Sequence, residues 1–183
     1  MEIINSHTRK FAQAYFEYDA KKSFGVTKSH LRFGDRPIRA SYYVKQADFV
    51  ACHNPTYIDK YDIAQEVKPG GTLLLNCAWT GEDLEKHLPA SVKREIAQKG
   101  IRFYTIDAVK IADQLGLGSH TNMVLQSAFF HLMPVIPVEE AIGYMKDAAR
   151  KTYFAKGEDV VNKNLAAIDA GREGLVEVKV PEA

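Results

Sequence analysis

The chain has 183 residues, 46% of them hydrophobic, which suits one domain with a core of ordinary size. Its formal net charge is +1 with acids and bases interleaved, so no polyanionic partner such as a nucleic acid is expected. No apolar run is long enough to span a membrane, and no signal-peptide pattern opens the chain. The two cysteines, Cys52 and Cys77, form no CxxC pair. The sequence therefore predicts a reduced cytoplasmic protein with no metal cluster of its own.

The first part of the chain predicts extended structure rather than helix. Residues 12–18 and 26–33 are expected to be extended, with residues 19–25 joining them. The short apolar run at 47–52 then predicts a buried strand.

A helix is expected after that strand. Asn54 can cap it, Pro55 fits its first position, and four residues would share one face: Tyr57, Ile58, Tyr61 and Ala64. The Lys-Pro-Gly-Gly sequence at 68–71 ends this helix, and residues 71–77 predict a second buried strand.

The second half of the chain alternates helix and strand patterns. Thr80 and Asp83 resemble a capping box that opens a helical stretch near residues 84–88. The following elements are a helix over 91–99 ended by Gly100, a strand at 102–106, a helix capped by Asp107 and ended by Gly116, a buried helix over 121–132, a helix starting at Pro137, and an edge strand in 174–180. This order predicts an α/β fold, a doubly wound and mostly parallel sheet with helices on both faces.

In such a sheet, ligands bind beyond the carboxyl ends of the strands. Polar residues follow three predicted strands there: His53 with Asn54, Asn76 with Cys77, and Asp107. Asn54 and Asp107 also serve as helix caps, and Cys77 also reads as a small core residue. Asn76 is the strongest candidate for ligand binding, because no helix begins immediately after it.

A second candidate site is the basic segment that runs from Asp19 to Gly34. Lys21, Lys22, Ser29 and Arg32 could together bind an anion such as a phosphate or a carboxylate. The alternative is an ordinary exposed loop, since such loops are commonly basic.

Several motifs of known chemistry are absent from the sequence. The first residues carry no Gly-rich turn between a strand and a helix, so a dinucleotide site is unsupported. A GxSxG elbow, an HExxH helix, a Walker loop and a paired-carboxylate motif are also missing. No catalytic residue is assigned.

Long stretches of the chain resemble one enzyme family. The chain is similar to the gamma-type domain of pyruvate:ferredoxin (flavodoxin) oxidoreductase, a 2-oxoacid:acceptor oxidoreductase. The matching stretches are YFEYDAKKSFGVTKSHLRFG (15–34), PIRASYYV (37–44), ADFVACHNPTYIDKYD (47–62), GGTLLLNCAW (70–79), FYTIDAVKIA (103–112), NMVLQSAFF (122–130) and the run from Ile136 to Gly171.

The resemblance implies an activity that this chain does not perform alone. Such enzymes oxidatively decarboxylate pyruvate with coenzyme A, giving acetyl-CoA and CO2. They pass electrons through thiamine diphosphate and [4Fe–4S] clusters, held on other domains, to ferredoxin or flavodoxin. For this chain the resemblance implies packing against other domains or subunits and a role in the coenzyme A approach, which the basic segment fits.

The resemblance also implies truncation at both ends. The family has a strand and a Gly-rich loop before the position of Glu2, and a linker to a ferredoxin-like domain after the last residues. We therefore expect a gamma-type domain at residues 1–171 and a C-terminal strand with the start of a linker at 172–183. A missing first strand would leave an apolar sheet edge, so the chain is expected to form a homo-oligomer or to rearrange near its N-terminus.

Three functions remain open at this point. The chain is a non-catalytic domain of the oxidoreductase, a separate gamma subunit that acts in assembly, or a small-molecule module that binds coenzyme A or a nucleotide at the strand ends. The implied truncation favours the first.

Overall fold

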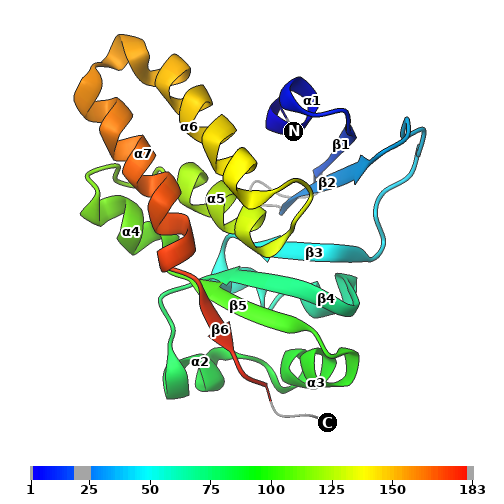
Figure 1. Ribbon diagram of the computed structural model, residues 1–183. Helices are drawn as coiled ribbons and strands as arrows, with labels where there is room; N and C mark the ends of the chain where they lie inside the picture. The colour runs from blue at the N-terminus through cyan, green and yellow to red at the C-terminus, as the bar shows by residue number, and fades with distance from the viewer. Residues whose placement is uncertain (1, 19–25, 181–183) are drawn as a thin grey trace.

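A computed structural model of the chain describes residues 2–18 and 26–180 (Figure 1). Its main sheet has four strands in the order β3-β4-β5-β6. Strands β3 (Ala47–Cys52), β4 (Val67–Asn76) and β5 (Arg102–Ile106) are parallel, and β6 (Val176–Val178) pairs antiparallel with β5. The expected α/β class with a mostly parallel sheet is confirmed.

Helices cover both faces of this sheet, as the sequence predicted. Side chains alternate along β4, so Leu73 and Leu75 pack toward α2 (Gly81–His87) and α3 (Ala90–Lys99). Leu74 points the other way, into a cluster with residues of α4 (Ala108–Gln114), α5 (Asn122–Leu132) and α7 (Glu158–Glu173). Helix α6 (Val138–Tyr153) runs beside α7 and is joined to it through the turn η3 (Phe154–Lys156) (Figure 1). No helix in the described part of the chain is long and apolar enough to cross a membrane.

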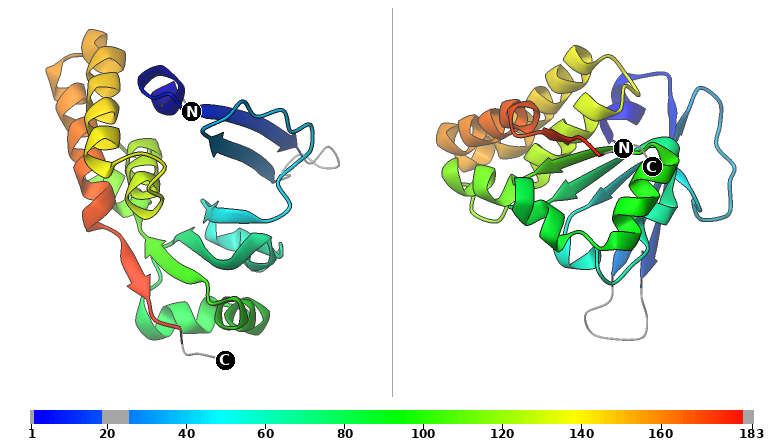
Figure 2. Two further views of the ribbon diagram at one scale, coloured as in Figure 1. Left: turned by 45° about the vertical axis from the view of Figure 1, so that its right-hand side comes forward. Right: turned by 90° about the horizontal axis from the view of Figure 1, so that it is seen from below.

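The N-terminal segment forms a second, smaller sheet. After the short helix α1 (Glu2–His7), β1 (Phe11–Tyr18) and β2 (Thr27–Gly34) make an antiparallel hairpin of their own (Figure 2). Both strands match the extended segments expected there. Within the described residues the hairpin does not pair with β3, which therefore forms one edge of the main sheet.

Two local expectations were wrong. The helix expected after Asn54 is replaced by two short 3₁₀ turns, η1 (Pro55–Tyr57) and η2 (Ile63–Glu66), and β4 begins directly after them at Val67. A lysine from α3 satisfies the carbonyls of this non-helical connection: Lys99 Nζ donates to those of Ala64, Gln65 and Val67 at 3.0–3.3 Å.

The capping box expected at the start of α2 does not form either. The side chain of Thr80 makes no capping hydrogen bond. The first turn instead depends on the Thr80 carbonyl, which accepts from the backbone N–H groups of Asp83 and Leu84. Gly81 allows this entry into the helix, because its φ of +52° suits glycine and few other residues.

The C-terminal strand is part of the same sheet. Strand β6 follows α7 and pairs with β5 from Thr105↔Val176 to Phe103↔Val178. Residue 172, the expected domain boundary, falls inside α7. The division into 1–171 and 172–183 stays a prediction about a longer protein.

Candidate functional site

The carboxyl ends of β3, β4 and β5 lie together, and Asn76 connects them. Its Nδ2 donates to the His53 carbonyl at 3.1 Å, and its Oδ1 accepts from the Ala108 N–H at 3.0 Å. Asn76 is only 7% exposed, so both polar ends of its amide are used inside the protein. The residue joins the end of β3 to the start of α4.

The two neighbouring cap residues are also hydrogen-bonded within the chain. Asn54 Oδ1 accepts from Thr56 N at 3.1 Å and from Thr56 Oγ1 at 2.9 Å. Asp107 Oδ1 accepts from Lys110 N at 3.0 Å and so caps α4, as expected. The sequence correctly placed Asn54, Asn76 and Asp107 at one edge of the sheet, and there the chain's own backbone takes up their side chains.

Three titratable groups at this edge, Cys52, Cys77 and His53, have pKa values shifted toward their neutral forms. Burial raises the pKa of the Cys52 thiol to about 11, and burial also raises the pKa of Cys77. Cys52 Sγ donates to the Asn54 carbonyl at 3.1 Å. Desolvation lowers the pKa of His53, although the residue is exposed overall. Two protonated thiols and a neutral imidazole can form hydrogen bonds, but a protonated thiol is a poor nucleophile.

The hairpin separates the two candidate anion-binding residues of the basic segment that the structure describes, Ser29 and Arg32. Antiparallel partners share a face, so Ser29, opposite Phe16, lies on one face and Arg32, opposite Gln13, on the other. Arg32 Nη2 donates to the Tyr42 carbonyl at 2.6 Å, and its guanidinium lies 4.9 Å from the centre of the Tyr42 ring. Ser29 is exposed. Lys21 and Lys22 lie outside the described residues.

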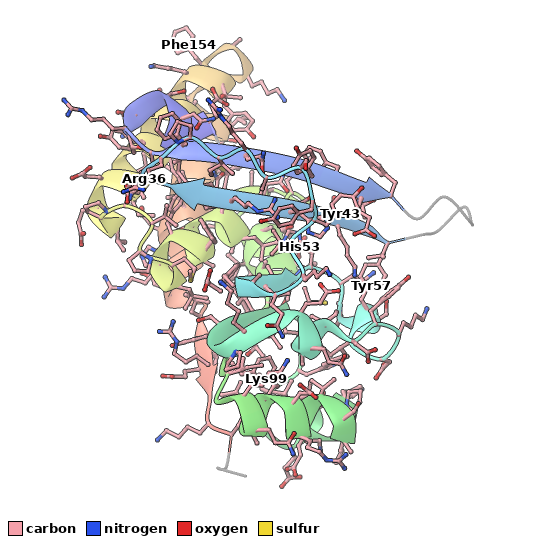
Figure 3. The ribbon with its side chains drawn as sticks, turned by 90° about the vertical axis from the view of Figure 1, so that its right-hand side faces the viewer. Arg36, Tyr43, His53, Tyr57, Lys99 and Phe154 are labelled. Atoms are coloured by element: carbon pink, nitrogen blue, oxygen red, sulfur yellow. The ribbon has the colours of Figure 1, made fainter. Side chains whose placement is uncertain are left out.

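A polar network that the sequence reading missed fixes the chain segment after the hairpin. His30 is almost enclosed, with its Nε2 3.0 Å from Glu17 Oε2, and its Nδ1 accepts from the Val44 N–H at 3.2 Å. The Tyr43 ring stacks on the His30 ring at 4.8 Å and meets the Tyr15 ring edge-on. Tyr43 is labelled in Figure 3. The pairing of Tyr15 with His30 across the hairpin would have been the signal, once the register was known.

Lys28 ties the hairpin to the main sheet. Its Nζ forms an ion pair with Glu66, the last residue of η2. This hydrogen bond raises the pKa of Lys28 against the opposing effect of partial burial. Of the cations in the basic segment, the two on β2 are thus engaged with the protein itself.

The structure does not bring the candidate residues together in one place. Within residues 2–18 and 26–180, no three His, Cys, Asp or Glu side chains cluster in a way that could hold a metal ion. Asn54 and Asn76 each lie at the end of a strand of the main sheet, while Ser29 and Arg32 belong to the hairpin. The candidate residues therefore fall into two places in the described structure.

The architecture assigns the chain to the doubly wound α/β domains, and comparison with known proteins identifies its family. The family model of pyruvate ferredoxin/flavodoxin oxidoreductase matches residues 3–174. The chain belongs to this family.

Its relatives among characterised proteins are much longer. The chain is 52% identical over 181 residues to a pyruvate:ferredoxin oxidoreductase of Moorella thermoacetica, a match that covers 99% of this chain and 16% of the relative. It is 48% identical over 181 residues to a pyruvate-flavodoxin oxidoreductase of Klebsiella pneumoniae, again over 99% and 16%. A pyruvate dehydrogenase [NADP(+)] of Cryptosporidium parvum is 44% identical over 179 residues, covering 97% of this chain and 9% of that protein.

Solved structures support the fold. The pyruvate oxidoreductase subunit PORC of Thermotoga maritima has a TM-score of 0.69 at 20% identity, with 97% of this chain and 85% of that chain covered. The gamma subunit of a keto/oxoacid ferredoxin oxidoreductase of Geobacter sulfurreducens has a TM-score of 0.64 at 18% identity, over 94% and 85%.

Proposed function

We propose that this chain acts as a non-catalytic domain of a pyruvate oxidoreductase that uses coenzyme A and forms acetyl-CoA and CO2. One observation carries the proposal. The names of the relatives share pyruvate but differ in the electron acceptor, which is ferredoxin, flavodoxin or NADP+, while the matching segment stays 44–52% identical. A segment common to enzymes with different acceptors serves the pyruvate half of the reaction rather than the choice of acceptor.

Within that enzyme, the role we propose for the chain is to form one wall of the coenzyme A approach. Coenzyme A carries phosphate groups, and phosphates bind lysine side chains and hydroxyl groups. Lys21 and Lys22 are the residues of the basic segment whose charge suits this role. Arg32, already bonded to Tyr42, would contribute by holding the segment after the hairpin in place.

The proposal assigns thiamine diphosphate and [4Fe–4S] clusters to other parts of the enzyme. The two cysteines described here are buried, are free of disulfide bonds and have raised pKa values, which does not fit cluster ligation. Other domains or subunits, and ferredoxin or flavodoxin through the intact enzyme, are the proposed partners. Free buried thiols also favour a reducing compartment, and we place the enzyme in the cytoplasm.

Two alternatives remain as competing proposals. A separate gamma subunit is favoured by the fold shared with the Thermotoga subunit. A small-molecule module that binds coenzyme A or a nucleotide would use His53 and the strand ends, where the imidazole is neutral.

The proposal is tested by replacing the matching segment of the Moorella enzyme with this chain. A chimera that reduces ferredoxin with pyruvate and coenzyme A would support the domain role, and an inactive chimera that retains its clusters and thiamine diphosphate would contradict it. Titration of the 183-residue chain with coenzyme A, with Lys22→Ala and Arg32→Ala as variants, tests the approach role. No saturable binding at millimolar coenzyme A would leave only a scaffold.

A further inference from the structure

The outer face of the hairpin is uncharged, largely apolar and exposed. We define it by the residues that project from this face toward the free end of the hairpin: Ala14, Phe16, Tyr18, Thr27, Ser29 and Leu31. Phe16 is 55% exposed, Tyr18 69% and Leu31 44%. Leu31 lies opposite Ala14 and is a diagonal neighbour of Phe16, so the three apolar side chains form one surface.

Every charged residue of the described hairpin strands projects from the other face. Glu17, Lys28 and Arg32 alternate with the outer-face residues along their strands, and so do Tyr15 and His30. That inner face is covered by Tyr42, Tyr43 and Val44. The charged side chains of the described hairpin strands therefore share the face that residues 42–44 pack against, while Phe16, Tyr18 and Leu31 project from the opposite face.

The same outer face is already used as a packing surface at its other end. Ala12 and Phe33 join the core cluster formed with α5 and α6, and the Phe33 ring lies 6.2 Å from the Phe129 ring. One end of the face, at Ala12 and Phe33, is thus packed against the core, while the other end, at Phe16, Tyr18 and Leu31, is exposed. Beyond residue 43, three large apolar residues are more than half exposed, namely Val109, Phe154 and Val176. Each of them lies on a different element. Figure 3 shows Phe154 at the end of the molecule opposite Lys99.

We propose that the outer face of the hairpin binds an apolar, uncharged surface on an adjoining part of the same oxidoreductase. This inference rests on the proposed domain function. The relatives of known activity are long chains in which the matching segment makes up 9–16%, so the segment has most of an enzyme to contact. A face without charges has no complement for a charged partner, and contiguous exposed aromatic surface is typical of interfaces. A hairpin of two strands also gains stability when its second face is packed.

The experiment uses the Moorella chimera and compares single cysteine variants. Phe16→Cys and Leu31→Cys probe the outer face, and Val109→Cys on α4 is the matched control, since Val109 is 54% exposed and Phe16 55%. Each variant is labelled with a maleimide both in the 183-residue chain and in the chimera, and modification is measured by peptide mass spectrometry. We expect similar labelling rates in the isolated chain. In the chimera, labelling at F16C and L31C is expected to fall at least tenfold relative to V109C.

The outcomes separate this inference from the proposed function. An active chimera that labels F16C and L31C as fast as V109C overturns the inference and leaves the domain function standing. An inactive chimera that retains its cofactors overturns both. Hydroxyl-radical footprinting of Phe16, Tyr18 and Leu31 in the unsubstituted chimera gives the same comparison without any new thiol. Protection of these residues only in dimers of the isolated chain would identify a second copy as the occupant and would also overturn the inference.

Discussion

Gly171 on α7 lies directly against Ser127 on α5. A Cβ atom placed on Gly171 would be 2.6 Å from Ser127 Cβ and 2.6 Å from the Val124 carbonyl oxygen, much closer than real Cβ atoms approach. The two helices are further joined by a buried hydrogen bond from Ser127 Oγ to the Ile168 carbonyl. This contact fixes α7 over the sheet and hence the position from which β6 enters it.

Gly171→Ala is therefore expected to destabilise the chain. Steric overlap in a packed interior costs about 1–3 kcal/mol, and the better helix propensity of alanine recovers about 1 kcal/mol of it. Gly143→Ala on α6 is the matched control, because a Cβ there meets nothing within 4 Å. Urea unfolding should show a lower free energy of unfolding for Gly171→Ala and one about 0.5–1 kcal/mol higher for Gly143→Ala. A gain for both would contradict the close approach.

Lys99→Met should destabilise the connection between β3 and β4. The lysine reaches three carbonyls of this connection and an ion pair with Glu95, and its side chain is only 18% exposed. Methionine keeps the apolar stem but leaves those carbonyls without their donor, at a cost of about 1–3 kcal/mol. Lys93→Met, which removes one exposed bond to the Glu85 carbonyl, should change the free energy of unfolding by less than about 0.5 kcal/mol. Equal effects of the two substitutions would count against a stabilising role for the Lys99 hydrogen bonds.

Much of the fold could be predicted from local patterns. Strands β3 and β5 and helices α3 and α5 follow their expected bounds to within a residue, because apolar runs, caps and glycine stops coincide there. Asp107 caps α4, and Gly100 ends α3 at a φ of +60°. The connection after Asn54 could not be predicted, since the lysine that satisfies its carbonyls is Lys99, more than thirty residues further along the chain.

The candidate site, too, could be predicted only where it depends on local sequence patterns. Asn54, Asn76 and Asp107 were placed correctly at the strand ends, because parallel strands bring their carboxyl ends together. The side-chain amide of Asn76 is hydrogen-bonded at both ends within the chain, to the His53 carbonyl and the Ala108 N–H. Both partners are distant from Asn76 in sequence, so this could not be predicted. Likewise, the separation of Ser29 and Arg32 onto opposite faces follows from the hairpin register, which a list of basic residues does not contain.

Asn76→Asp should make stability depend on pH in a defined direction. The carboxylate keeps an acceptor for Ala108 N but places an oxygen against the His53 carbonyl, which the native amide approaches with a donor. A protonated acid can donate, so the pKa of the new carboxyl should rise on folding. At pH 4 the variant should then be nearly as stable as the native chain. As the pH rises to 7, its free energy of unfolding should fall by about 1–3 kcal/mol relative to that of the native chain. Urea unfolding at both pH values measures this difference, and a loss independent of pH would refute the assigned hydrogen bond.

The buried thiol of Cys52 predicts a loss of stability at alkaline pH. Its pKa rises to about 11 on folding, while an unfolded cysteine titrates near its ordinary value of about 8.5. Between these values the unfolded chain releases a proton that the folded chain keeps, so stability is complete below about pH 8.5 and falls as the pH approaches 11. The contribution amounts to about 3 kcal/mol. Cys52→Ala should show a shallower decline from pH 8.5 to 10.5, and an unchanged slope would contradict the burial effect.

The free edge of β3 predicts self-association of the isolated chain. Strand β3 has no partner on its outer side within the described residues, and its one charge, Asp48, is paired with Lys68. An apolar strand edge without an opposing charge, proline or cover invites pairing with another copy. Light scattering at rising concentration should show oligomers, and Ala51→Lys, an exposed position on β3, should reduce them. Val176→Lys on the opposite edge strand is the control, since Glu177 and Lys179 already protect that edge with charge. A strictly monomeric native chain at high concentration would show that this edge is protected after all, and equal effects of the two lysines would place the contact elsewhere.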